Sequence, residues 1–320
     1  MQVKAADPAA AEPRTRPEHR VRPSRATPPR WRSRKVQGLA YAAPTAVFVT
    51  VFFLLPLLLV GQMSLSDWPL LAGDRGFNAP ENYTDATDST LFWPAVRFTL
   101  LYTAIVTVVL LGLALLLALL VQESRPGAGF FRTVYFLPGA LGLASASLLF
   151  WGLYSPSTGP LSRLLGKLGL VDDPVSFLGT PTSALLSTVF LIVWKFAGFY
   201  MLILLVGLQR IPQEVFEAAR MDGASRGQIF RSITLPLLRP SLALTLLLCV
   251  TGSLLAFDQF FILTKGGPDN STVTVVQLIY REAFQRLNLG TAAALSITVL
   301  AVLLLLNVLQ FRGLRRADES

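Results

Sequence analysis

The chain has 320 residues, of which 52% are hydrophobic and only 15% are charged. This balance excludes an ordinary soluble globular domain and indicates an integral membrane protein. The net charge of +9 is concentrated at the start, where residues 1–36 hold ten Lys/Arg against three Asp/Glu, and we expect no nucleic-acid partner. One cysteine, Cys249, and one histidine, His19, leave no disulfide framework and predict no metal site and no catalytic residue.

Residues 1–36 are rich in Pro, Arg, Ala and Ser and lack hydrophobic periodicity, which predicts a disordered basic cytoplasmic tail near anionic lipid headgroups. Six later segments are long enough for a hydrocarbon core that needs about 20 apolar residues in a helix. They are residues 39–60, 96–121, 133–154, 183–208, 241–263 and 289–310. The third is the least hydrophobic, since it holds Pro138 and several small residues, but such residues are common in packed transmembrane helices.

The distribution of Lys and Arg predicts the orientation of these six spans. The two termini and the loops 122–132 and 209–240 together carry 20 Lys/Arg, whereas the other three loops carry six. We therefore expect a multi-pass protein of the cytoplasmic (inner) membrane with both termini in the cytoplasm. The same count places the loop 209–240 on the cytoplasmic side.

The loop between the fourth and fifth spans has helical patterning of its own. Pro212 suits a first helical position, and an apolar stripe at helical spacing follows it. Gly223 suits the left-handed residue that ends a helix. Ser225 followed by Gln228 forms a capping-box pattern, which predicts a second short helix from residue 226 to about 234, just before Pro236. The loop is therefore expected to be a cytoplasmic helical hairpin.

The residue identities in this hairpin resemble the EAA motif of permease subunits of binding-protein-dependent ABC importers. That motif is EAA, three residues, G, nine residues, then I-x-L-P. The matching residues here are Glu217, Ala218, Ala219, Gly223, Ile233, Leu235 and Pro236.

Further segments resemble the sugar-importer branch of this family, the MalF or UgpA type. They are residues 131–138, 194–199, 263–268 and 292–296. The resemblance implies an all-α, six-transmembrane-helix ABC importer permease of the type I kind with a cytoplasmic coupling hairpin. It predicts a permease domain over residues 37–316, a coupling loop over 210–240 and a C-terminal tail over 317–320.

The resemblance also implies partners and a mechanism. It predicts a second, MalG-like permease subunit, an ABC ATPase dimer, an extracytoplasmic solute-binding protein, a carbohydrate substrate and a lipid bilayer. Glu217 would face a cleft of the ATPase, with Ala218 and Ala219 allowing close approach. This chain has no phosphate-binding loop, because Gly166-Lys167 is followed by Leu168. It is therefore expected to bind no cofactor and to be no enzyme itself, with ATP and Mg on the partner ATPase.

Polar residues within the spans are candidates for a translocation path, because such residues are costly in a bilayer. Thr251 and Asp258 are seven apart and Ser296 and Asn307 eleven apart, so each pair would share a helix face. Lys195 is either a path residue or a structural charge, and as a structural charge it would pair with Asp258, pair with helix carbonyls or extend its ammonium to the membrane surface. The aromatic residues Phe190, Phe196, Tyr200 and Phe260 could stack on sugar rings or simply pack.

Two alternatives stay open at this point, and a third has no motif to support it. An ABC permease for a non-sugar solute, such as a phosphorylated polyol, phosphate or a polyamine, would carry the same hairpin. A secondary transporter or channel would commonly show inverted repeats or broken helices in matching positions, which are not visible in the sequence. An intramembrane enzyme would need paired Asp, a Ser/His pair or HExxH within a span, and none is present.

Overall fold

The computed structural model describes residues 34–122, 127–171 and 173–318, and their regular elements are all helical apart from two isolated β-bridges. The elements in chain order are α1 (Arg34–Val49), η2 (Thr50–Leu54), α2 (Leu55–Ser64), α3 (Glu81–Asp88), α4 (Phe92–Val121), α5 (Ala128–Phe136), η3 (Leu137–Ala140), α6 (Leu143–Leu153), α7 (Pro160–Lys167), α8 (Pro181–Gln209), α9 (Gln213–Met221), α10 (Arg226–Ile229), η4 (Phe230–Thr234), α11 (Leu235–Leu237), α12 (Arg239–Leu254), α13 (Asp258–Leu263), α14 (Val275–Tyr280), η5 (Arg281–Gln285) and α15 (Leu289–Asp318). The predicted all-α class is confirmed.

The chain divides into two units, residues 1–55 and 56–320. The predicted tail lies outside the described residues except for residues 34–36, which begin α1. The rest of the first unit is the apolar α1 followed by the π-helical turn η2. This turn contains Phe52, whose carbonyl would meet the ring of Pro56 in a regular α-helix, so the wider turn accommodates the proline.

Five of the predicted spans are segments long and apolar enough to cross a membrane; four are helical throughout, and one, Arg239–Leu263, contains a short break at residues 255–257. They are Gly38–Ser64, Phe92–Val121, Pro181–Gln209, Arg239–Leu263 and Leu289–Gly313. The third predicted span is instead a bent pair of helical segments, Gly129–Ala140 and Leu143–Leu153, which meet at 93°. The expected total of six is reached among the described residues when this pair counts as one span.

We call residues 137–142, between α5 and α6, the elbow. Pro138 has no N–H to continue the helical ladder, and the chain tightens into the 3₁₀ turn η3. Leu141 and Gly142 then take extended backbone angles, which end one helix and start the next in a new direction. The third predicted span is therefore bent and not one helix, and Pro138, Gly139 and Gly142 of that segment lie at the break.

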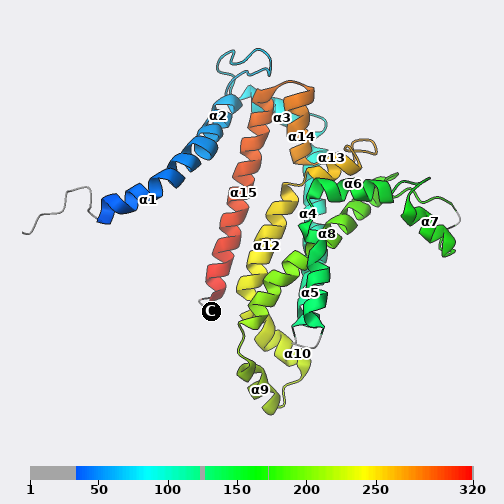
Figure 1. Ribbon diagram of the computed structural model, residues 1–320. Coiled ribbons are helices and arrows are strands. Elements are labelled where there is room, and N and C mark those ends of the chain that lie inside the picture. Colours follow the sequence, from blue (N-terminus) through cyan, green and yellow to red (C-terminus); the bar gives the residue numbers. More distant parts are fainter. Residues whose placement is uncertain (1–33, 123–126, 172, 319–320) are drawn as a thin grey trace, which may run out of the picture. The chain divides into compact units, whose positions relative to one another are not determined.

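The core of the second unit forms where α4, α8 and α12 pack together (Figure 1). α8 is central, since 56% of the residues in its most apolar 18-residue stretch are buried, against 22% in the corresponding stretch of α15. On α4, Val106, Leu110 and Ala114 face this core with at most 1% exposure. The polar hairpin of α9 and α10 lies at one end of this bundle, and α3 and α14 lie at the other (Figure 1).

The end that carries α3 is fastened by a buried asparagine. Asn82 is 2% exposed, and its amide donates to the carbonyls of Ser64 (3.1 Å) and Ser66 (2.9 Å). Tyr83 donates to the hydroxyl of Ser64 at 3.1 Å. These bonds join α3 to the end of α2, so the segment after the first span is held by side chains rather than by a β-sheet.

Candidate functional site

The first helix of the hairpin, α9, ends in a well-formed glycine cap. Gly223 has φ +78°, a conformation that costs a residue with a side chain about 1–2 kcal/mol. Its N–H donates to the carbonyl of Arg220 (3.1 Å), and the N–H of Ala224 donates to that of Ala219 (3.0 Å). This pair of bonds is the Schellman arrangement, in which the last carbonyls of a helix are satisfied. The predicted role of Gly223 as the turn residue is confirmed.

The second helix begins with the predicted reciprocal cap. The Ser225 N–H donates to the Gln228 side chain at 2.7 Å, and the Gln228 N–H donates to the Ser225 hydroxyl at 3.4 Å. The sequence predicts that this helix ends before Pro236, and that prediction is wrong. The helix continues through the π-helical turn η4 into α11. The wider turn contains Ser232, whose carbonyl would clash with the proline ring in a regular helix, and it repeats the solution seen before Pro56.

The hairpin presents its motif residues at the surface of the chain. Glu217 is exposed and accepts a hydrogen bond from the Gln213 amide at 3.0 Å. Ala218 and Met221 are also exposed, the latter to 88%, whereas Ala219 is half-buried. The remaining motif residues lie further along the second helix, where Ile233 and Pro236 are half-buried and Leu235 is 37% exposed. Among these motif residues the one carboxylate, Glu217, lies with small and apolar side chains, and Glu214, Arg220 and Asp222 beside them are exposed as well, a mixture that suits contact with another protein.

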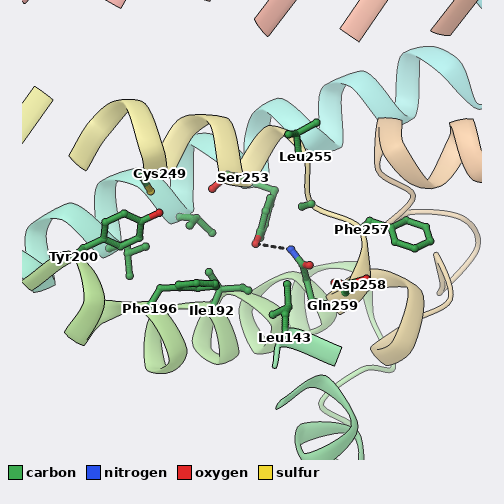
Figure 2. A pocket seen from close by; sticks show the side chains of 15 residues that line it. Leu143, Ile192, Phe196, Tyr200, Cys249, Ser253, Leu255, Phe257, Asp258 and Gln259 are labelled. Carbon is green, nitrogen blue, oxygen red and sulfur yellow. Dashed lines mark hydrogen bonds between the residues drawn. The ribbon is translucent and has the colours of Figure 1, made fainter. Parts of the chain in front are cut away.

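A cavity of about 190 Å³ lies among α4, α8, α12 and α13, in the transmembrane part of the second unit (Figure 2). It is smaller than the ~300–1,000 Å³ usual for ligand sites. Gly252, Leu255 and Asp258 line it and are exposed, so the cavity is open to one face of the chain. Passage of a solute larger than a few waters would therefore require the surrounding helices to separate.

The cavity carries a polar group without a partner. The Gln259 amide donates to the Tyr102 hydroxyl at 3.1 Å, and this is the bond drawn in Figure 2. Gln259 is 2% exposed, and among the described residues its Oε1 has no hydrogen-bond partner. An unpaired buried carbonyl costs about 1–3 kcal/mol. Tyr200 and Ser253 also line the cavity and add hydroxyl groups, so the cavity suits a ligand that donates hydrogen bonds.

Of the five residues predicted for the path, only Asp258 lines this cavity. Thr251 and Asp258 do not share a continuous helix face as expected, because residues 255–257 interrupt the helix between α12 and α13. Thr251 instead donates to the Asn307 side chain on α15 at 3.5 Å. Ser296 donates to the carbonyl of Ala292 in its own helix at 2.8 Å.

Lys195 lies outside the lining of the cavity. It is 3% exposed, and its ammonium donates to the carbonyls of Gly139 (3.3 Å) and Leu141 in the elbow. Among the described residues no carboxylate forms an ion pair with it. Lys195 therefore pairs with main-chain carbonyls, as one of the alternatives from the sequence proposed, and does not pair with Asp258.

The four aromatic residues noted in the sequence differ in position. Phe196 and Tyr200 line the cavity, whereas Phe190 is 58% exposed and Phe260 is fully buried against the ring of Tyr102.

Sequence reasoning missed Tyr102 and Gln259. The available signal was a polar residue inside each of two apolar spans. The described residues contain no group of three His, Cys, Asp or Glu side chains that could hold a metal ion.

The helical spans, the exposed polar hairpin and the cavity between the spans define a membrane transport subunit that works with other proteins. The chain belongs to the family described as "Binding-protein-dependent transport system inner membrane component", whose sequence profile matches residues 39–317.

Relatives in this family cover most of the chain. It is 31% identical to the multiple sugar-binding transport system permease protein MsmF of Streptococcus mutans, over 87% of this chain and 95% of that protein. It is 34% identical to the trehalose/maltose transport system permease protein MalF of Thermococcus litoralis, over 79% of this chain and 84% of that protein. The resemblance predicted from the hairpin motif is therefore confirmed.

A solved structure is similar over nearly the whole fold. A chain of a bacterial ABC transporter involved in the import of the acidic polysaccharide alginate is 26% identical to this chain, with a TM-score of 0.78. The match covers 88% of this chain and 96% of that one. A second structure of an alginate transporter, in complex with an alginate pentasaccharide-bound periplasmic protein, matches with the same TM-score and 25% identity over 89% of this chain and 97% of that one.

Proposed function

We propose that the chain is the permease subunit of an ATP-driven importer whose solute is a carbohydrate delivered by an extracytoplasmic solute-binding protein. Its relatives include permeases named for sugar uptake, and a similar solved transporter imports a polysaccharide. The importer would also contain a second permease subunit and an ABC ATPase dimer.

The single observation that carries the solute class is the Gln259 carbonyl in the cavity. This buried acceptor lacks a partner among the described residues, and the hydroxyl groups of neighbouring side chains surround the same space. A carbohydrate supplies many hydroxyl donors and little charge. The aromatic ring of Phe196 provides an apolar face in the same cavity. A polycation would instead need several acidic groups there, and among the described residues Asp258 is the only acid that lines the cavity.

We place the coupling to ATP at the exposed hairpin. Glu217 and Ala218 would contact the ATPase, where a charge fixes the register of docking more than it adds affinity. ATP and Mg would be bound and ATP hydrolysed by the partner, while this chain carries the solute path. Closure of the ATPase dimer would move the hairpin, and α8 would carry the displacement because only residues 210–212 separate it from α9.

The orientation proposed for the chain follows from its basic residues, with both termini and the hairpin in the cytoplasm and the protein in the inner membrane. We propose the domain limits stated from the sequence, a tail over residues 1–36, a permease domain over 37–316 with the coupling loop 210–240, and a C-terminal tail over 317–320.

Uptake by the whole importer reconstituted in liposomes tests the solute class. Gln259→Leu should raise the half-saturating concentration or lower the rate of carbohydrate uptake by about 5–150-fold, the equivalent of 1–3 kcal/mol for one buried hydrogen bond. The matched control is Gln277→Leu, because Gln277 is also 2% exposed and its Oε1 likewise lacks a partner in the part of the chain that the structure describes, but it does not line the cavity.

The two variants are compared at equal amounts of assembled complex. Equal uptake by Gln259→Leu and the wild type would remove the cavity from the solute path. Import of a polyamine or a phosphorylated polyol in preference to all carbohydrates tested would contradict the proposed solute class and leave the coupling proposal intact.

A further inference from the structure

Lys195 is a buried cation that the solute path does not use. It lies in α8 and is 3% exposed, yet no carboxylate of the described residues pairs with it. A buried ammonium without such compensation is costly, and its position needs a reason. Its two acceptors, the carbonyls of Gly139 and Leu141, are both in the elbow.

These carbonyls are available because the helix is broken there. The extended angles of Leu141 and Gly142 take the following N–H groups out of the helical ladder, which frees the carbonyl of Gly139 in η3 and that of Leu141 just after it to accept from another helix. The ammonium of Lys195 supplies donors from a different helix. Its ring contact with Phe196, at 4.9 Å from the centroid, adds a second favourable interaction.

α8 also touches α5 directly, about one turn from Lys195. A Cβ built on Gly198 would lie 1.9 Å from the carbonyl oxygen of Tyr135 and 2.8 Å from the nitrogen of Phe136. The two backbones are therefore in contact, and no side chain separates them. The ammonium contact and this backbone contact together fix the elbow against α8 at two neighbouring points.

The two sides of this junction lead to different functional parts. Toward the cytoplasm α8 continues without a break to Gln209, about 21 Å away at 1.5 Å per residue, and then to the coupling hairpin. On the other side α6 begins at Leu143, which lines the cavity, and α6 packs against α13. α13 carries Asp258 and Gln259 into the cavity wall.

We propose that Lys195 is a positioning residue that fastens the elbow to α8, so that movement of the coupling hairpin reaches α6 and α13 and changes the cavity. This inference rests on the proposed function. It assigns to Lys195 the transmission of motion and not contact with the solute.

The test separates ATP hydrolysis from uptake in liposomes that hold the whole importer. In Lys195→Met the solute-binding protein still stimulates hydrolysis, while the amount of carbohydrate imported per ATP falls by about 5–150-fold, the usual range of conformational coupling. Lys195→Arg keeps a cation with several donors and retains more of the ratio. Thr188→Val is the matched control, since Thr188 is fully buried in the same helix and its hydroxyl donates to the carbonyl of Ala184 within that helix.

Cys249 provides a second readout that does not depend on uptake. It is the chain's only cysteine and lines the cavity. Its rate of alkylation by N-ethylmaleimide should change between nucleotide-free and ATP-bound wild-type complex, and should stay constant in Lys195→Met. Where Lys195→Met fails to assemble, Lys195→Gln replaces it, because the amide still donates hydrogen bonds without the charge and should keep part of the nucleotide response.

The following outcomes would contradict either the positioning role of Lys195 or the proposed function. An unchanged ratio of solute to ATP in Lys195→Met, or losses of uptake and hydrolysis in equal proportion, would overturn the positioning role. A normal nucleotide response of Cys249 in the same variant would also overturn it. A wild-type importer that moves no carbohydrate contradicts the proposed function instead, and the response of Cys249 to ATP still reports on Lys195.

Discussion

Replacement of Gly198 by alanine should force α5 and α8 apart at the elbow. The new Cβ would lie 1.9 Å from the Tyr135 carbonyl oxygen and 2.3 Å from its carbon, and both atoms belong to the backbone. Ordinary contact requires about 3.4 Å, so the two helices must separate by about 1.5 Å. No side-chain rotation can relieve this clash.

The expected cost is that of overpacking a well-packed interior, about 1–3 kcal/mol. For a chain of 320 residues such a loss lowers the thermal midpoint by about 1.5–4.5 °C, at about 2.1 cal/mol/K of unfolding entropy per residue. The variant should also lose carbohydrate uptake more than ATP hydrolysis, because the separation weakens the contact of Lys195 with the elbow.

Thermal unfolding of the purified complex at one fixed scan rate measures the first effect, since membrane complexes unfold irreversibly. Gly112→Ala is the matched control, because Gly112 lies inside α4 and a Cβ there would meet nothing within 4 Å. A Gly198→Ala complex as stable as the Gly112→Ala complex would refute the direct backbone contact.

Three further perturbations test other parts of the structure. Gly223→Pro should abolish uptake without loss of membrane insertion, because proline fixes φ near −65° while the turn has φ +78°. Normal uptake by this variant would refute the hairpin's role. Tyr102→Phe leaves the Gln259 amide without its acceptor and should cost about 1–3 kcal/mol of stability in the same thermal assay, and an unchanged midpoint would count against that bond. Burial raises the pKa of Glu282, although Arg286 at 2.8 Å opposes the shift, so the folded protein holds this proton at higher pH than the unfolded chain. The stability of the wild type relative to Glu282→Gln is therefore greatest below about pH 4.5, the ordinary pKa of a glutamate, and it falls as the pH rises through the raised pKa. A stability difference between the two proteins that does not change with pH would contradict this.

Local chemistry made the hairpin predictable from the sequence. Gly223 and the Ser225–Gln228 pair act on neighbouring residues, so their effect depends little on the rest of the fold. The spans were predictable for a similar reason, because their length and apolar composition are properties of the segments themselves. The continuation of the second hairpin helix through Pro236 was not foreseen, since a π-helical turn leaves no clear pattern in the sequence.

The cavity could not be predicted in the same way. Gln259 and Tyr102 are 157 residues apart and meet only because α13 follows a break in the chain after α12. The elbow shows the same limit, since Pro138 marked a weak span but not its 93° bend. The partners of Lys195 depend on that bend, so the sequence left a structural role and a path role both open.

Carbohydrate uptake into liposomes that contain the whole importer, with ATP enclosed and the solute-binding protein outside, tests the central claim most directly. The wild type should accumulate carbohydrate only with ATP and the binding protein together, and the Gly223→Pro complex should accumulate none while still binding the solute-loaded protein. ATP-dependent uptake by the Gly223→Pro complex at the wild-type rate would contradict the account.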